Sequence, residues 1–268
     1  MTTLAYTVTD STTMLRRNLR RLQRYPSLTL MLAGMPIVFL LLFVYVFGGQ
    51  LGNGLDTSLS GGHTGRAAYL NYVAPGIVLM TVAAAVQGTA IVVAMDMTGG
   101  IIDRFRTMAI ARAAVLTGHV LASLIQSLLS IGIVIGVAVA LGFRPTAGAL
   151  GWLGAAGLLA LFAFALIWLA TALGLAAKSV ETASNTPMFL TFLPFLGSGF
   201  VPADSMPTGL RQFAQYQPFT PMTETLRGLL TGTPIGATNA VGALAWSAGI
   251  ALASYLWARR LYARRRSA

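Results

Sequence analysis

The sequence predicts an all-α integral membrane protein with six transmembrane helices, because of its composition, its hydropathy and the form of its apolar runs. Apolar residues make up 56% of the 268 residues and charged residues only 9%, whereas soluble domains carry about 25% charged residues. The mean hydropathy is +0.73. The apolar runs do not alternate as membrane β-strands do, and helices are the other structure that satisfies the backbone in lipid. We therefore expect a single helical membrane domain.

Six charge-free intervals are each long enough to cross a bilayer, which takes about 20 mostly apolar residues. The fifth interval contains Pro187, Pro194, Gly197 and Gly199. Proline removes a backbone hydrogen bond and glycine loosens the helix, so we expect this span to break near its outer end. The expected spans cover residues 28–49, 71–95, 117–142, 150–176, 186–201 and 238–258.

The distribution of Lys and Arg predicts which ends of the spans face the cytoplasm. With a cytoplasmic N-terminus, 14 of the 18 basic residues lie in cytoplasmic segments and 4 lie outside. Cytoplasmic loops carry the excess of basic residues, so both termini are expected inside. Arginines cluster before the first span and after the last. Anionic lipid headgroups attract basic residues at these positions, so we expect the net charge of +11 to reflect contact with the membrane surface rather than binding of nucleic acid. The first apolar run is too long for a signal peptide and is expected to be retained.

Two segments outside the spans are expected to lie at the membrane surface. Residues 11–26 place Leu15, Leu19 and Leu22 at helical spacing between arginines and end at Pro26, which is typical of an interfacial amphipathic helix. The segment 202–237 holds five prolines and apolar stretches too short to cross. We expect two short outer re-entrant helices there, and a plain external cap is the alternative.

The inner loop between the second and third spans carries a compact charged segment, "GGIIDRFRTMAIAR", at 99–112. Its apolar and charged residues interleave at roughly helical spacing. We expect a short amphipathic helix just below the membrane. The alternative is a solvated loop whose arginines only fix the topology.

The sequence offers no convincing catalytic or metal site. The two histidines, His63 and His119, are expected on opposite faces of the membrane, and the chain has no cysteine. A nucleotide-binding P-loop needs a lysine after glycine, but the only lysine, Lys178, follows Ala177. No acidic residue lies in the middle of an expected span, which disfavours an ion-coupled carrier. Any ATP hydrolysis must therefore come from another polypeptide.

A few polar and aromatic residues within the spans could line a path for a transported molecule. A buried amide in lipid more commonly bonds a neighbouring helix, so this assignment has a structural alternative. Gly132 and Gly136 form a GxxxG pair that suits either internal packing or dimerisation. The candidate path residues are Gln87, Gln126, Trp168, Met188, Phe189 and Phe192.

Two motifs give the chain a resemblance to a known family. The inner segment "GGIIDRFRTMAIARAAVLTGHVLA" is similar to a G-x-x-[DE]-R-[FL]-R motif, and the outer segment "SGFVPADSMPTGLRQFAQYQPFTPMTETLRGLLTG" is similar to an S-G-x-x-x-P…M-P…P-x-T…L-R-G signature. Together with the six spans they resemble the type 2 ABC exporter permeases, in particular the daunorubicin-resistance-like drug export permeases. The sequence departs from the family in having Ala109, not proline, before Ile110.

The resemblance implies a role for the inner helix at 99–112. In such permeases it is the coupling helix, which docks into a cytoplasmic ATPase. The residues that the resemblance assigns to this docking are Gly99, Ile102, Asp103, Arg104, Phe105 and Arg106.

The resemblance also implies an assembly of two permeases, the same chain or homologous ones, with two ABC ATPase subunits that bind ATP and Mg, and no cofactor in this chain. The first and fifth spans would face the partner permease, and the complex would sit in a plasma membrane, with a bacterial origin expected. The implied cargo is a lipophilic drug, antibiotic or lipid-like compound. Alternatives are a polysaccharide or glycolipid exporter and, with less support, a secondary transporter without an ATPase.

Overall fold

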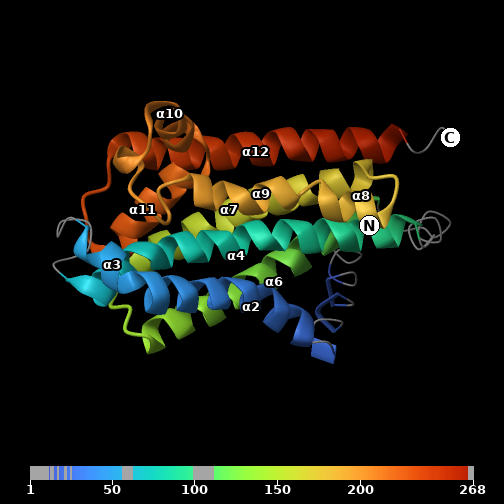
Figure 1. Cartoon of the computed structure of the whole chain (residues 1–268). Coiled ribbons are helices and arrows are strands. Elements are labelled where there is room, and N and C mark those ends of the chain that lie inside the picture. Colours follow the sequence, from blue (N-terminus) through green and yellow to red (C-terminus); the bar gives the residue numbers. More distant parts are fainter. Residues whose placement is uncertain are drawn as a thin grey trace.

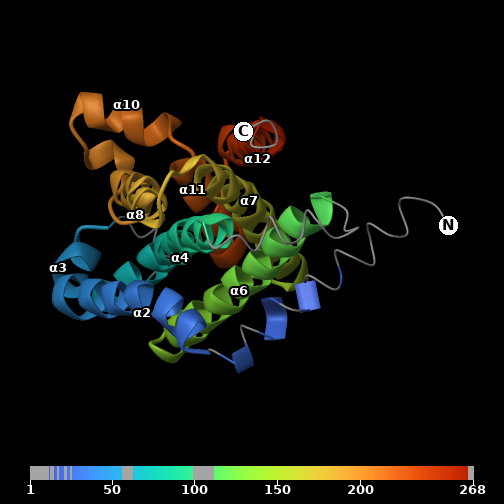
Figure 2. The ribbon, with the colours of Figure 1, turned by 90° about the vertical axis from the view of Figure 1, so that its right-hand side faces the viewer.

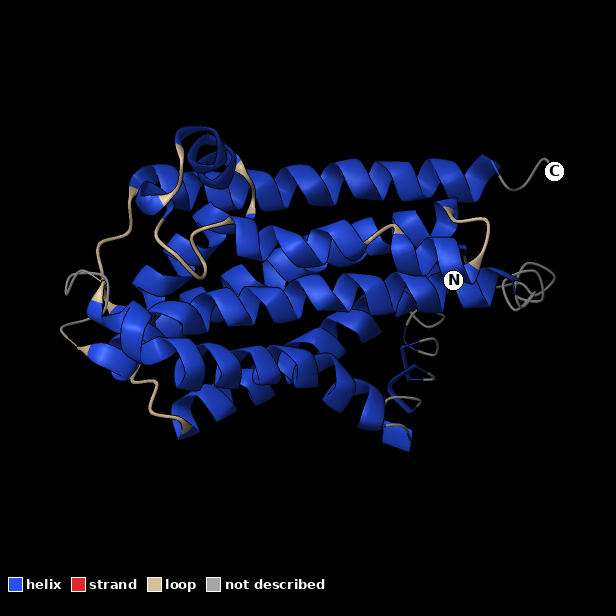
Figure 3. Ribbon diagram, in the orientation of Figure 1, coloured by secondary structure: helices blue, strands red, loops and turns tan. Residues whose placement is uncertain are grey.

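Helices make up all the regular structure in the part of the chain that the computed structural model describes (Figures 1 and 3). The structure describes residues 26–55, 63–98 and 112–264, together with 12, 15, 16, 18–20, 23 and 24. Five helices within these residues are long and apolar enough to cross a membrane. They are Thr29–Asn53, Gly65–Met97, Thr117–Ala140, Ala149–Ala176 and Ala237–Tyr262.

The first of these helices is built from three joined pieces. They are α2 (Pro26–Leu42), the π-helical turn η1 (Phe43–Phe47) and α3 (Gly48–Asn53). Proline is well suited to the first position of α2, where its missing N–H needs no partner. Pro36 lies inside α2 and removes one bond of the ladder. The three pieces continue one another as a helix despite these interruptions, because lipid offers the backbone no other hydrogen-bonding partner.

The helices α4 (Gly65–Thr98) and α7 (Ala149–Ala176) form the centre of the molecule. In both, 72% of the most apolar stretch is buried, compared with 17 to 33% in the other three spans. Figure 2, viewed close to the helix axes, shows α4 with α2, α6 and α7 around it. α6 (Arg112–Ala140) and α12 (Ala237–Arg264) lie outside this centre, with α12 against α7. Both α2 and α12 are left with large exposed apolar faces.

The two ends of the bundle are distinguished by their contacts. At the first, called here the α3 end, the N–H of Ala147 donates to the carbonyl of Leu230 at 3.1 Å, and the N–H of Arg144 donates to Asn71 Oδ1 at 3.2 Å. At the opposite end, called the α8 end, His119 of α6 lies 3.0 Å from Asp96 of α4. α7 and α12 both begin at the α3 end and run side by side (Figure 1). The chain must therefore return to the α3 end between them.

This return is made by short helices rather than by one span. α8 (Val180–Asn185), α9 (Met188–Phe192) and the 3-10 turn η2 (Leu193–Leu196) follow one another along α4. Ser179 caps α8, its Oγ accepting from the N–H of Thr182 at 3.2 Å. Pro187 lies between α8 and α9, and Pro194 falls within η2. The segment expected as a span at 186–201 is thus interrupted along its length, not only near its outer end, and it is not among the five long helices.

Two helices occupy the segment between η2 and α12, and they differ in their burial. α10 (Thr208–Tyr216) is amphipathic and lies on the surface, following the short turn η3 (Ala203–Ser205). α11 (Phe219–Thr231) is largely buried and packs against α12, α7 and α4. In Figure 1, α11 lies against the bundle while α10 stands apart at its edge. The apolar side of α11 therefore belongs to the core of the α3 end.

Candidate functional site at the α3 end

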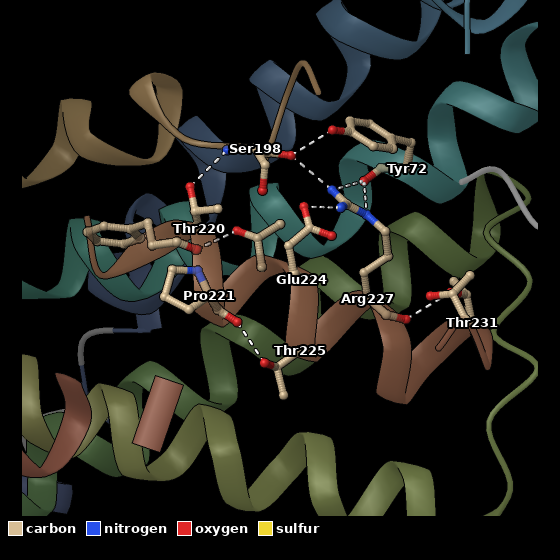
Figure 4. Close-up of polar contacts among 11 residues, drawn as sticks. Tyr72, Ser198, Thr220, Pro221, Glu224, Thr225, Arg227 and Thr231 are labelled. Carbon is tan, nitrogen blue, oxygen red and sulfur yellow. Dashed lines mark hydrogen bonds and ion pairs between the residues drawn. The ribbon is translucent and has the colours of Figure 1, made fainter. Parts of the chain in front are cut away.

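The sequence of α11 allows a polar helix to be buried in apolar surroundings. Two of its threonine hydroxyls donate hydrogen bonds to carbonyls four residues earlier. Thr223 donates to the carbonyl of Phe219 at 2.8 Å, and Thr225 donates to that of Pro221 at 2.7 Å (Figure 4). Such bonds satisfy a hydroxyl without a partner on another helix. Gly232 ends the helix in the left-handed region, with φ of 71°. This local satisfaction leaves Glu224 and Arg227 as the two charged side chains of α11.

Arg227 is 1% exposed and is held by three different segments. Its Nη1 donates to Glu224 Oε1 at 2.6 Å, one turn back in α11. Its Nη2 donates to the carbonyl of Ser198 at 3.0 Å and to that of Tyr72 at 3.3 Å. The guanidinium carbon also lies 4.0 Å from the ring centroid of Tyr72, in cation–π geometry. The buried positive charge is therefore neutralised and hydrogen-bonded within the protein.

The loop that carries Ser198 is fixed to α4 and α11 by further contacts. The hydroxyl of Tyr72 donates to the Ser198 carbonyl at 2.8 Å, and the Ser198 N–H donates to Thr220 Oγ1 at 3.2 Å (Figure 4). A Cβ atom placed on Gly76 would lie 2.5 Å from the carbonyl oxygen of Gly199, so the two backbones meet at a distance that only glycine permits. The loop at 197–200, α4 and α11 thus form one rigid unit, called here the Arg227 clamp.

A cavity of about 500 Å³ opens beside the Arg227 clamp. Its lining comes from α10, α11, α12, the segment around η3 and the clamp itself, which contributes Arg227, Tyr72 and Ser198. The other lining residues include Glu224, Asp204, Asn239, Tyr216 and Trp246. Its size falls within the range of small-molecule sites, roughly 300 to 1,000 Å³. Its walls combine two carboxylates, the guanidinium of Arg227, amides and aromatic rings.

The structure does not bring the candidate path residues together. Gln87 donates to the carbonyl of Ser184 at 3.1 Å and so joins α4 to α8, which matches the structural alternative for a buried amide. Gln126 is half-buried on α6. Trp168 is buried where α7 meets α12, with its ring centroid 5.0 Å from that of Tyr255.

The other three candidate path residues lie together on the outside of α9. Met188, Phe189 and Phe192 are all exposed, Phe189 to 80%. They form an apolar face that no described part of the chain covers. A path that includes both this face and Trp168 is not formed by the described residues of a single chain.

The residues proposed to contact an ATPase lie outside the described residues. The structure instead shows what lies on either side of them. Asp96 lies near the end of α4 and His119 near the start of α6. The Nε2 of His119 lies 3.0 Å from Oδ2 of Asp96, and both side chains are 9% exposed. This pair joins the two helices that lead into and out of the segment 99–112. Among the described residues no group of His, Asp and Glu side chains could hold a metal ion.

The sequence did not predict the Arg227 clamp, and Arg227 is one of the four basic residues expected outside the membrane. A signal was present, because Glu224 and Arg227 stand three residues apart in an otherwise apolar and threonine-rich stretch. A pair at that spacing can form on one face of a helix. The partners Tyr72 and Ser198 lie 155 and 29 residues away in the sequence and carried no signal.

The described residues define a multi-pass helical membrane protein, a class that fits the packing of α4 and α7 inside apolar neighbours. The chain belongs to the ABC-2 type transporter family, whose model matches residues 9–231. The prediction of this family is confirmed, and with it that of a membrane permease. Membership implies an ABC ATPase as the partner of the chain.

Two relatives show where the similarity lies. The chain is 28% identical over 230 residues to a daunorubicin resistance ABC transporter permease protein of Streptomyces coeruleorubidus, which covers 85% of this chain and 77% of that one. It is 27% identical over 179 residues to a probable doxorubicin resistance ABC transporter permease protein of Mycobacterium tuberculosis, with 64% and 63% of the two chains covered.

Proposed function

We propose that the chain is the permease subunit of an ATP-driven exporter that moves a lipophilic drug, antibiotic or lipid-like compound out of the cell. The observation that carries this proposal is the family match over residues 9–231, together with the similarity to permeases named for daunorubicin and doxorubicin resistance. The apolar, weakly charged helices suit a molecule that reaches the protein from the bilayer. A separate ATPase subunit binds ATP and Mg and hydrolyses the nucleotide, and the permease chain itself needs no cofactor.

The proposed orientation places the α3 end outside and the α8 end in the cytoplasm. The excess of Lys and Arg at the termini and in the 96–117 region favours this arrangement. The return of the chain from α7 to α12 through α8, α9 and η2 supports a sixth, interrupted passage. Both termini then lie in the cytoplasm of a cell with this protein in its plasma membrane, and the outer helices α10 and α11 stand at the exit.

The proposed complex contains two permeases and two ATPase subunits. The exposed apolar surfaces of α2 and α9 support a contact with a second permease, the same chain or a homologous one. Met31 of α2 and Phe189 of α9 are each 80% exposed. Association of two such surfaces would enclose the candidate path residues Met188, Phe189 and Phe192, which a single chain leaves open.

The proposed mechanism transmits motion from the ATPase along α4. Closure of the ATPase subunits around ATP would displace the coupling segment 99–112, which connects α4 to α6. The buried pair Asp96–His119 would make the two helices move together. At its other end α4 carries Tyr72 and Gly76, which belong to the Arg227 clamp and contact α11 and the loop at 197–200. A shift of α4 would thus reach the exit as movement of a rigid unit.

Charge reversal in the coupling segment tests the proposal. The double variant Asp103→Arg, Arg104→Glu should still insert in the membrane but should lose copurification with the ATPase and ATP-dependent export. The matched control is Glu181→Arg, a reversal of an exposed charge at the α8 end, which should keep both properties. Export that survives the double reversal, or that proceeds without any ATPase, would favour a secondary transporter instead.

A further inference from the structure

The first span contains a bending point where its π-helical turn, η1, meets a pair of glycines. Phe43–Phe47 form the turn, and Gly48 and Gly49 follow it. A π-turn holds one residue more than an α-helical turn, and such turns are rare and occur frequently at functional sites. Sharp kinks in helices concentrate at π-turns and at pairs of small residues. The angle between α2 and α3 is therefore set at this one place.

The outer side of the bending point is fixed to the rest of the protein. α3 packs closely against α4, and a Cβ atom placed on Gly52 would overlap the carbonyl oxygen of Gly65. The guanidinium carbon of Arg66 lies 4.9 Å from the ring centroid of Tyr45, which ties the turn itself to α4. If the angle between α2 and α3 changes, α2 is therefore the piece that moves.

The inner piece, α2, is held by few buried side chains. Only 22% of the most apolar stretch of the first span is buried. The buried residues of α2 form a narrow stripe that includes Ala33 and Leu40, whereas Met31, Met35 and Val38 are exposed. Regions with few buried apolar contacts open at a low cost in free energy. α2 can therefore change its angle without disrupting the centre of the bundle.

Four phenylalanine rings, called here the aromatic seam, join the first span to the interrupted passage. They are Phe39 of α2, Phe43 of η1, Phe195 of η2 and Phe200 of the loop at 197–200. The ring centroids of Phe39 and Phe195 lie 5.3 Å apart, and those of Phe43 and Phe200 lie 4.9 Å apart. Phe195 stacks on Phe200 at 4.5 Å, and the Phe200 carbonyl accepts from the hydroxyl of Tyr69 at 3.1 Å. One half of the seam thus belongs to the fixed body, and the other half moves with α2.

The aromatic seam lies at the outer end of the exposed face of α9. The passage runs from the α8 end through α9 toward the α3 end (Figure 1), and Phe195 follows the exposed Phe192 by three residues. Cargo that moved outward along this face would therefore meet the seam. We propose that η1 is a hinge on which α2 swings, and that this swing parts the seam and opens the outer end of the path. The role in transport rests on the proposed function, whereas the hinge is a property of the single chain.

Labelling of a cysteine inside the seam tests the hinge without the ATPase. The chain has no cysteine, so Phe195→Cys provides a single thiol for an apolar maleimide in the full chain in lipid vesicles. Deletion of Val46, which is 62% exposed, removes the extra residue of the π-turn and gives a continuous α-helix. The deletion should slow labelling about tenfold, because labelling tracks the population of the open form. Phe164→Cys, half-buried on α7, is the control and should react at the same rate in both backgrounds.

A reversible bridge across the seam tests its role in transport. Phe39→Cys and Phe195→Cys are joined by a short bifunctional thiosulfonate in the complex with the ATPase, and the bridge is verified by mass. ATP-dependent export of a lipophilic dye should be lost and should return when the bridge is reduced. The matched control pair is Phe162→Cys and Phe219→Cys, whose ring centroids lie 5.2 Å apart between α7 and α11. Both helices belong to the fixed body, so this bridge should leave export unchanged.

The two tests separate the hinge from the export function. Slower labelling of residue 195 after the deletion, in a protein whose complex exports nothing, would support the hinge and refute the proposed function. Equal labelling of residue 195 with and without Val46, while residue 164 is unchanged, would overturn the hinge. Export that continues across a bridged seam would overturn its role as the outer gate.

Discussion

Replacing Arg227 with alanine should destabilise the protein more than any comparable change at its surface. The guanidinium donates four hydrogen bonds, to Glu224, to Ser198 and twice to Tyr72. Alanine would remove all of them and the cation–π contact at 4.0 Å. The side chain is 1% exposed, so water would not replace these contacts without opening the α3 end.

The size of the effect follows from what the partners retain. Breaking a buried ion pair by removing one partner costs about 3 to 5 kcal/mol. The Ser198 carbonyl would keep the hydroxyl of Tyr72 as a donor, and the Glu224 side chain is 27% exposed and can be hydrated. Both facts place the loss near the lower limit, about 3 kcal/mol. Arg227→Lys keeps the charge but loses the planar set of donors, and should cost about half as much.

The assay is unfolding in mixed micelles of a mild detergent and dodecyl sulfate, followed by circular dichroism. The matched control is Arg211→Ala, which breaks the ion pair with Asp204. In that pair the side chains are 45% and 79% exposed, and such pairs contribute at most about 1 kcal/mol. If Arg227→Ala and Arg211→Ala lower the free energy of unfolding by the same amount, the clamp does not stabilise the α3 end as argued here.

Two further predictions concern α4. Gly76→Ala should lower the free energy of unfolding by about 1 to 3 kcal/mol, since its Cβ would lie 2.5 Å from the carbonyl oxygen of Gly199. The control is Gly88→Ala, which should be neutral or stabilising by up to about 1 kcal/mol, because nothing lies within 4 Å of its Cβ. Equal losses of stability in the two variants would refute the close approach of Gly76 to Gly199. His119→Ala removes the 3.0 Å contact with Asp96 and should lower the free energy of unfolding by about 1 to 3 kcal/mol. A thermal unfolding midpoint equal to that of the wild type would show that the pair contributes nothing.

Hydropathy and charge were sufficient to predict a helical membrane protein because these signals are local in the sequence. A run such as that of α7, with no charge over 28 residues, has few other stable structures in lipid. The segment at 186–201 was harder. Its prolines signalled a break, but their effect depends on the packing of α8 and α9 against α4, which decides where helical turns persist.

The site was less predictable than the fold because its contacts are long-range. Arg227 was read as a loop charge because positive charges are usual at span ends. Its burial depends on Tyr72 and Ser198, which reach it only after α4, the loop at 197–200 and α11 have packed. Conversely, the coupling segment was predicted from its motif alone, and its assignment stays a prediction.

The most direct test of the central claim is cross-linking of the segment 99–112 to the ATPase. The chain contains no cysteine, so Phe105→Cys provides a single reactive position, and His63→Cys, in the connection between α3 and α4, is the matched control. The account predicts that residue 105 is cross-linked to an ABC ATPase coexpressed with the permease and is protected from a membrane-impermeant maleimide in intact cells, while residue 63 shows the reverse. Labelling of residue 105 from outside the cell, or its failure to cross-link in a complex that still transports, would contradict the claim.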